Sequence, residues 1–124
     1  MIFAHSFSRT EQTLFHSLQR SYDLHQLDCT QINGPEDLKA QLRYTKGNTL
    51  LYSFQKLDAY SHLDSFSIEC ERVSWLVEYI IEHDFDHVVI LSWPGAYFNS
   101  SNLFLQHKGI IEQKFVQSGI RCTL

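Results

Sequence analysis

The sequence lacks any long apolar run and any cluster of basic residues. No stretch approaches the ~20 consecutive apolar residues of a membrane span, and the first residues, MIFAH, have neither the basic start nor the apolar core of a signal peptide. Its ten lysines and arginines are scattered among fourteen acidic residues, for a net charge of −4. Nucleic-acid binding rests on clustered positive charge. We therefore expect a cytoplasmic protein that binds neither membrane nor nucleic acid.

Metal-binding and redox motifs are also missing. The three cysteines are far apart, without a C-x-x-C pair, and they predict free thiols in a reducing compartment. The seven histidines form no H-E-x-x-H motif, which argues against a dedicated zinc site. We expect no metal in this protein.

The chain instead alternates between strand-like and helix-like segments. With 124 residues, 44% of them hydrophobic, it is long enough for one domain that buries roughly two-thirds of its unfolded surface. Strands are expected at Met1–His5, Tyr22–Asp28, Thr49–Phe54, Asp86–Ser92 and from Ile120. Helices are expected at Thr10–Arg20, from Pro35 to about Tyr44, at Ser67–His83 and at Ser101–Ser118, with residues 55–65 irregular. This order predicts an α/β domain with a doubly wound parallel sheet of about five strands.

The segment from Asp86 to Glu112 is the most informative part of the chain. An unbroken apolar run, VVIL, ends in the loop SWPG and is followed by an amphipathic run that contains Lys108. A buried parallel strand, a loop and a helix bearing one lysine resemble the short-chain dehydrogenase/reductase superfamily, chiefly its NmrA-like and extended members. The resemblance implies a Rossmann-like fold from which one strand–helix unit is deleted, with five strands in the order 2-1-3-4-5.

The same resemblance implies that residues 1–124 form a single Rossmann-like domain without the family's C-terminal substrate-binding part. Family members continue beyond the strand that begins here near Ile120. The chain is therefore also consistent with a piece of a larger protein, or with a protein whose partner supplies the substrate half.

The loop that would hold a dinucleotide departs from the family pattern. Members place three glycines between the first strand and helix, so that the backbone approaches the pyrophosphate. Here the segment HSFSRTE has no glycine: Ser6 stands near the first glycine position, Arg9 is a candidate phosphate ligand, and Glu11 would repel a phosphate. Asp28 follows about twenty residues on, where a ribose-binding acid would stand. Alternatively, Asp28 caps the Thr30–Asn33 turn.

The acid/base pair of the family is also incomplete. Members place a tyrosine four residues before a lysine that lowers the phenol pKa and binds the ribose. Lys108 matches the lysine, but the residue four before it is Phe104. Ser92 and Tyr97 match other positions near the end of the strand, and with Lys108 they are candidate relics of a catalytic site. Alternatively, Lys108 is a solvated helix residue that pairs with Glu112, and Ser92 bonds its own turn.

These departures predict a degenerate, non-catalytic protein that acts through protein association and binds no cofactor. The resemblance implies a homodimer through the Ser67–His83 and Ser101–Ser118 helices. Both helices carry more apolar residues than one buried stripe needs, among them Trp75, Tyr79, Phe104 and Phe115. The competing interpretation is an NAD(P)-dependent reductase or epimerase-like enzyme that uses Lys108, Asp28 and an unorthodox Ser6–Arg9 loop.

Overall fold

The five strands form one parallel sheet in the order β2-β1-β3-β4-β5. The computed structural model describes residues 2–5, 9–42, 49–53, 62–91 and 101–123. The strands are β1 Ile2–His5, β2 His25–Asp28, β3 Thr49–Ser53, β4 His87–Leu91 and β5 Arg121–Thr123. The predicted fold class and strand order are confirmed: this is a minimal Rossmann-like α/β domain.

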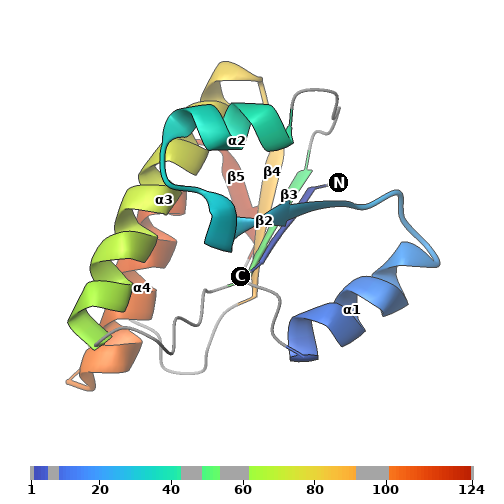
Figure 1. Cartoon of the computed structure of the whole chain (residues 1–124). Helices are drawn as coiled ribbons and strands as arrows, with labels where there is room; N and C mark the ends of the chain where they lie inside the picture. Colours follow the sequence, from blue (N-terminus) through green and yellow to red (C-terminus); the bar gives the residue numbers. More distant parts are fainter. Residues whose placement is uncertain (1, 6–8, 43–48, 54–61, 92–100, 124) are drawn as a thin grey trace.

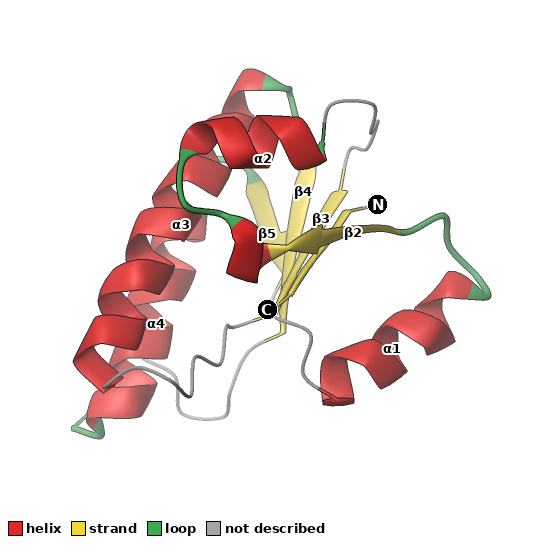
Figure 2. Ribbon diagram, in the orientation of Figure 1, coloured by secondary structure: helices red, strands yellow, loops and turns green. Residues whose placement is uncertain are grey.

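Helices cover the two faces of the sheet unequally. The helix α1 Arg9–Gln19 lies on one face, whereas α2 Pro35–Gln41, α3 His62–Glu82 and α4 Leu103–Val116 lie on the other (Figures 1 and 2). The connection from β1 to β2 runs toward one edge of the sheet, and the later connections run toward the other. Because each crossover is right-handed, this reversal of direction puts α1 opposite the other three helices.

The main core lies between the sheet and the helices α2, α3 and α4. Alternate strand residues point into it, since successive side chains of a strand face opposite sides. Its fully buried members from the strands are Ile2, Ala4, Leu27, Leu50, Tyr52, Val88 and Ile90, and its members from the helices are Leu38, Val73, Leu76, Ile80, Ile111 and Phe115. The rings of Tyr52 and Phe115 lie 4.8 Å apart across this layer.

The opposite face, which we name the α1 face, has a smaller core. Phe3 and Leu51 are buried there although neither belongs to the main core. Phe15 of α1 packs edge-on against Phe3, with 6.4 Å between ring centroids. Leu14 and Leu18 are half-buried, and the remaining described side chains of α1 are exposed. Phe15 is thus the buried side chain that joins the described part of α1 to the sheet.

Three of the expected element boundaries differ from the structure by three or more residues. The helix α2 ends at Gln41 rather than near Tyr44. The helix α3 begins at His62 rather than Ser67, so the expected irregular stretch is helical from residue 62 onward. Asp64 lies in its first turn, where a carboxylate favours the helix dipole, and Phe66 stacks on His107 of α4 at 3.8 Å. β2 begins at His25 rather than Tyr22 because its pairing partner, β1, is only four residues long.

Candidate functional site

The side chains of most interest lie near the carboxyl ends of the strands. Open parallel sheets bind ligands at that edge, at the point where strand order reverses, here between β1 and β3. Tyr52 is the penultimate residue of β3, and both α3 and α4 begin after strands that end at this edge. The early turns of these helices carry Glu69 and Lys108. We name Tyr52, Glu69 and Lys108 the Lys108 cluster.

Lys108 is buried and ion-paired across the two helices. Its Nζ lies 3.1 Å from Oε1 of Glu69, while Tyr52 Oη donates a hydrogen bond to Oε2 of the same carboxylate. The exposed fractions are 0% for Tyr52, 3% for Glu69 and 8% for Lys108. Both carboxylate oxygens are thus engaged inside the protein. The expectation that Lys108 is solvated is wrong, because α4 turns this side of the helix toward α3.

Two further charged residues lie buried in the same helices. Arg72 of α3 is 8% exposed and Glu112 of α4 is 5% exposed. Arg72 donates from Nε to the carbonyl oxygen of Ile32 at 2.9 Å, and from Nη2 to that of Thr30 at 3.4 Å. It therefore ties α3 to the segment that follows β2. Together with the Lys108 cluster, the two helices bury two acidic and two basic side chains, so their formal charges cancel.

Asp28 holds its own turn. Its Oδ1 accepts hydrogen bonds from the backbone N–H of Thr30 at 3.0 Å and from the Thr30 hydroxyl at 2.5 Å. This cap begins the short 3-10 helix Cys29–Gln31, as the turn-capping alternative predicted. The Gln41 side chain bonds both backbone groups of Asp28, accepting from its N–H at 2.9 Å and donating to its carbonyl at 3.0 Å. β2 is an edge strand of the sheet. The Gln41 amide makes the two backbone hydrogen bonds to Asp28 that a further strand at this edge would otherwise make.

The other candidate residues lie outside the part of the chain that the structure describes. Ser6, Ser92 and Tyr97 fall in the undescribed ranges 6–8 and 92–100. Arg9 is the first residue of α1, and Phe104 lies in the first turn of α4, but neither side chain is described. Of the candidates, the structure therefore places the side chains of Lys108, within α4, and Asp28, at the end of β2, and the two have different partners.

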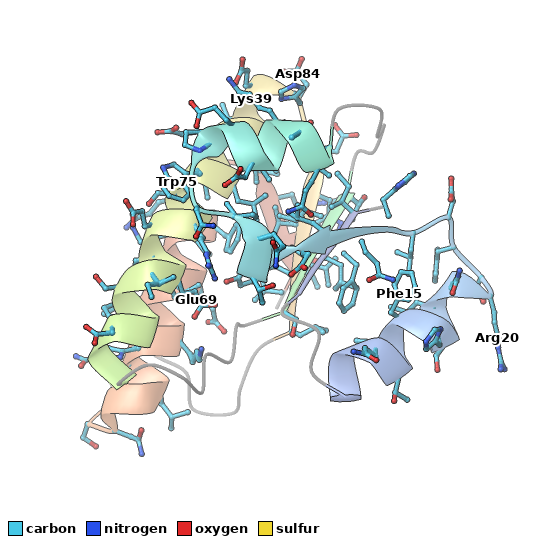
Figure 3. All side chains as sticks on the ribbon, in the orientation of Figure 1. Phe15, Arg20, Lys39, Glu69, Trp75 and Asp84 are labelled. Carbon is cyan, nitrogen blue, oxygen red and sulfur yellow. The ribbon has the colours of Figure 1, made fainter. Side chains whose placement is uncertain are left out.

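Sequence reasoning missed Tyr52, Glu69 and Arg72. A signal was present in α3, because Glu69 and Arg72 stand at helical spacing with Val73, Leu76 and other core residues. Charged residues at such positions are almost never buried unless they are paired. A buried acidic side chain on one helix therefore predicts a buried basic side chain on a neighbouring helix. Lys108 is such a side chain. Figure 3 labels Glu69 on the α3 side of the sheet.

Two of the described thiols, Cys70 and Cys122, have a raised pKa. Burial raises the pKa of the Cys70 thiol, an effect that nearby Lys114 partly offsets and Glu69 reinforces. Burial also raises the pKa of Cys122. The raised pKa values keep both thiols protonated at neutral pH. The protonated thiol is not the reactive form, which is the thiolate. The described part of the chain also contains no group of three or more His, Cys, Asp or Glu residues placed to hold a metal ion.

The resemblance implies that Lys108 and Asp28 contact NAD(P), and the structure gives both side chains partners within the protein. Lys108 would have to reach a ribose and a phenol, yet its ammonium is bound to Glu69 in the interior. Asp28 would have to accept from a ribose through Oδ2, since its Oδ1 already accepts twice from Thr30. The described residues can fasten β3, α3 and α4 together.

Comparisons with known proteins add no family to this picture. No family model matches the chain, and no curated protein or solved structure shows significant similarity to it. None of the described helices has both the length and the apolar character needed to cross a membrane. The resemblance to the short-chain dehydrogenase/reductase superfamily thus stays a prediction from sequence motifs.

Proposed function

We propose that this domain is a degenerate relative of the short-chain dehydrogenases/reductases, non-catalytic, that acts by associating with protein, first of all with a second copy of itself. The observation that supports this most directly is the burial of Lys108 and its ion pair with Glu69. The residue that would tune a proton donor and orient a ribose is bound inside the structure. The loop HSFSRTE, which has no glycine, supports the proposal independently.

The proposed self-association uses α3 and α4, but two of the residues that the sequence indicated for it are in the core. Tyr79 is 8% exposed and Phe115 is fully buried, so both belong to the core and are not surplus apolar surface. Ile81, near the end of α3, is 50% exposed, and Val116, the last residue of α4, is 45% exposed. These two side chains are the apolar groups that a second copy would cover.

Cofactor titration tests whether the catalytic function is lost. The full chain should bind NADH and NADPH with dissociation constants weaker than roughly 1 mM, equivalent to about 4 kcal/mol. Isothermal calorimetry measures the dissociation constants directly. We also expect that neither cofactor changes the melting temperature of the protein. Micromolar affinity for either one would overturn the non-catalytic proposal and support the NAD(P)-dependent reductase or epimerase-like alternative.

A further inference from the structure

The α1 face of the sheet is left without a described helix over β4 and β5. The register places Phe3, Leu51, Val89 and Thr123 side by side in one row across β1, β3, β4 and β5. The exposed fraction of these side chains rises from β1 to β5. It is 0% for Phe3 and 6% for Leu51, while Val89 is half-buried and Thr123 is exposed. The opposite face of the same two strands packs against the main core.

This imbalance is unusual for parallel strands, which are normally covered on both faces by helices. Val89 and Leu91 of β4 both point to the α1 face and are half-buried. Adjacent strands lie ~4.8 Å apart and a helix with its side chains is ~10 Å wide. One helix therefore suffices to cover β4 and β5. The face already holds a helix of this kind, since α1 packs on β1 through Phe15.

The charge on this surface indicates what kind of helix would fit. Arg121 of β5 is exposed on the α1 face, beside His87 in the register. His87 Nε2 lies 2.7 Å from the Thr123 hydroxyl. This contact joins a polar side chain of β4 to one of β5. The described residues on this face of β3, β4 and β5 include no carboxylate. A carboxylate on a bound helix would therefore be attracted by the Arg121 guanidinium and would not be repelled by a described carboxylate of these strands.

We infer that the β4–β5 part of the α1 face binds an amphipathic helix of a partner protein, with apolar side chains on Val89 and Leu91 and a carboxylate beside Arg121. The inference rests on the proposed role in protein association. It uses the opposite face of the sheet from Ile81 and Val116, so either surface can fail its test while the other passes.

Two matched peptides test the inference with the full chain. Both are capped, alanine-based helices of about four turns with leucines at i, i+4 and i+7, flanked by glutamates in one and by lysines in the other. In methyl NMR, the glutamate peptide should shift Val89 and Leu91 while shifting Val88 and Ile90, on the other face of the same strand, far less. We expect saturable binding below roughly 1 mM, tighter for the glutamate peptide than for the lysine peptide.

Charge reversal supplies the specificity control. Arg121→Glu should weaken the glutamate peptide roughly fivefold and make the lysine peptide the tighter of the two, since it turns one attractive contact into a repulsive one. Lys39→Glu is the matched control, because Lys39 is exposed on α2 across the sheet (Figure 3) and its reversal should leave the preference unchanged.

Three results would overturn the inference. The first is that neither peptide binds. The second is that the shifts appear at Val88 and Ile90 and not at Val89 and Leu91. The third is that Arg121→Glu dissociates a homodimer of the free chain, because the face would then be an interface between two copies.

Discussion

At the scale of single residues, Lys108 shows how burial changes the meaning of a side chain. On an exposed helix surface its substitution would change stability by at most about 0.5 kcal/mol. The ammonium instead lies 3.1 Å from Glu69, whose carboxylate is 3% exposed and also accepts from Tyr52. Removing one partner of such a pair takes a compensating charge away from a buried group, which costs far more than the pair itself contributes.

We therefore predict that Lys108→Met destabilises the protein by about 3–5 kcal/mol, measured by urea unfolding. Methionine fills a similar volume, so the loss reports the ion pair removed from the Glu69 carboxylate rather than a cavity. The double variant Lys108→Met with Glu69→Gln should recover most of the loss, because a neutral amide still accepts from Tyr52. A single variant that loses less than about 0.5 kcal/mol would show that Lys108 faces solvent after all.

At the scale of elements, the turn that ends α3 contains Asp84, a residue whose left-handed backbone conformation is unfavourable for a side chain with a Cβ. Phe85 N–H bonds the carbonyl of Ile80 at 3.0 Å, and Asp84 N–H bonds that of Ile81 at 3.3 Å. This is the Schellman arrangement, which requires a left-handed residue. Asp84 occupies that position with φ 55°, where a Cβ is unfavourable and glycine is usual. The α4 end uses glycine instead: Gly119 has φ 83°.

We predict that Asp84→Gly stabilises the protein by about 0.5–1 kcal/mol, since glycine removes the left-handed penalty without losing a described hydrogen bond. Gly119→Ala should have the opposite effect, costing about 1 kcal/mol, because a Cβ there meets no neighbouring atom and only the backbone is strained. Urea unfolding measures both. Asp86→Gly is the control, and it should not stabilise; an equal gain from Asp86→Gly would attribute the effect to lost charge and not to backbone geometry.

At the scale of the whole molecule, the sheet and its helices leave two apolar surfaces on opposite sides. The α3 and α4 ends expose Ile81 and Val116, and the α1 face leaves Val89 and Leu91 half-buried. The β2 edge is less open to an added strand, because Gln41 already pairs the backbone of Asp28. We therefore expect helices rather than the β2 edge to mediate association.

The predicted homodimer can be tested at its remaining exposed side chains. Ile81→Asp combined with Val116→Asp should shift a dimer to monomer in sedimentation velocity, because a charge buried at an interface without a partner is costly. Tyr22→Asp is the control: Tyr22 is 53% exposed but lies in the turn after α1, so this change should leave the assembly intact. A wild-type chain that stays monomeric at high concentration would contradict the self-association proposal.

The sequence by itself determined the architecture. Alternating elements required a doubly wound parallel sheet, the resemblance supplied the order 2-1-3-4-5, and Asp28 followed by Thr30 indicated the turn that Asp28 caps. The tertiary structure alone decided the role of Lys108. Helical periodicity shows that Lys108 and Glu112 share one side of α4, but it cannot show which helix that side packs against. The partner proved to be Glu69, 39 residues away along the chain, because the parallel sheet sets α3 beside α4 and the low dielectric between them requires each buried charge to find its opposite.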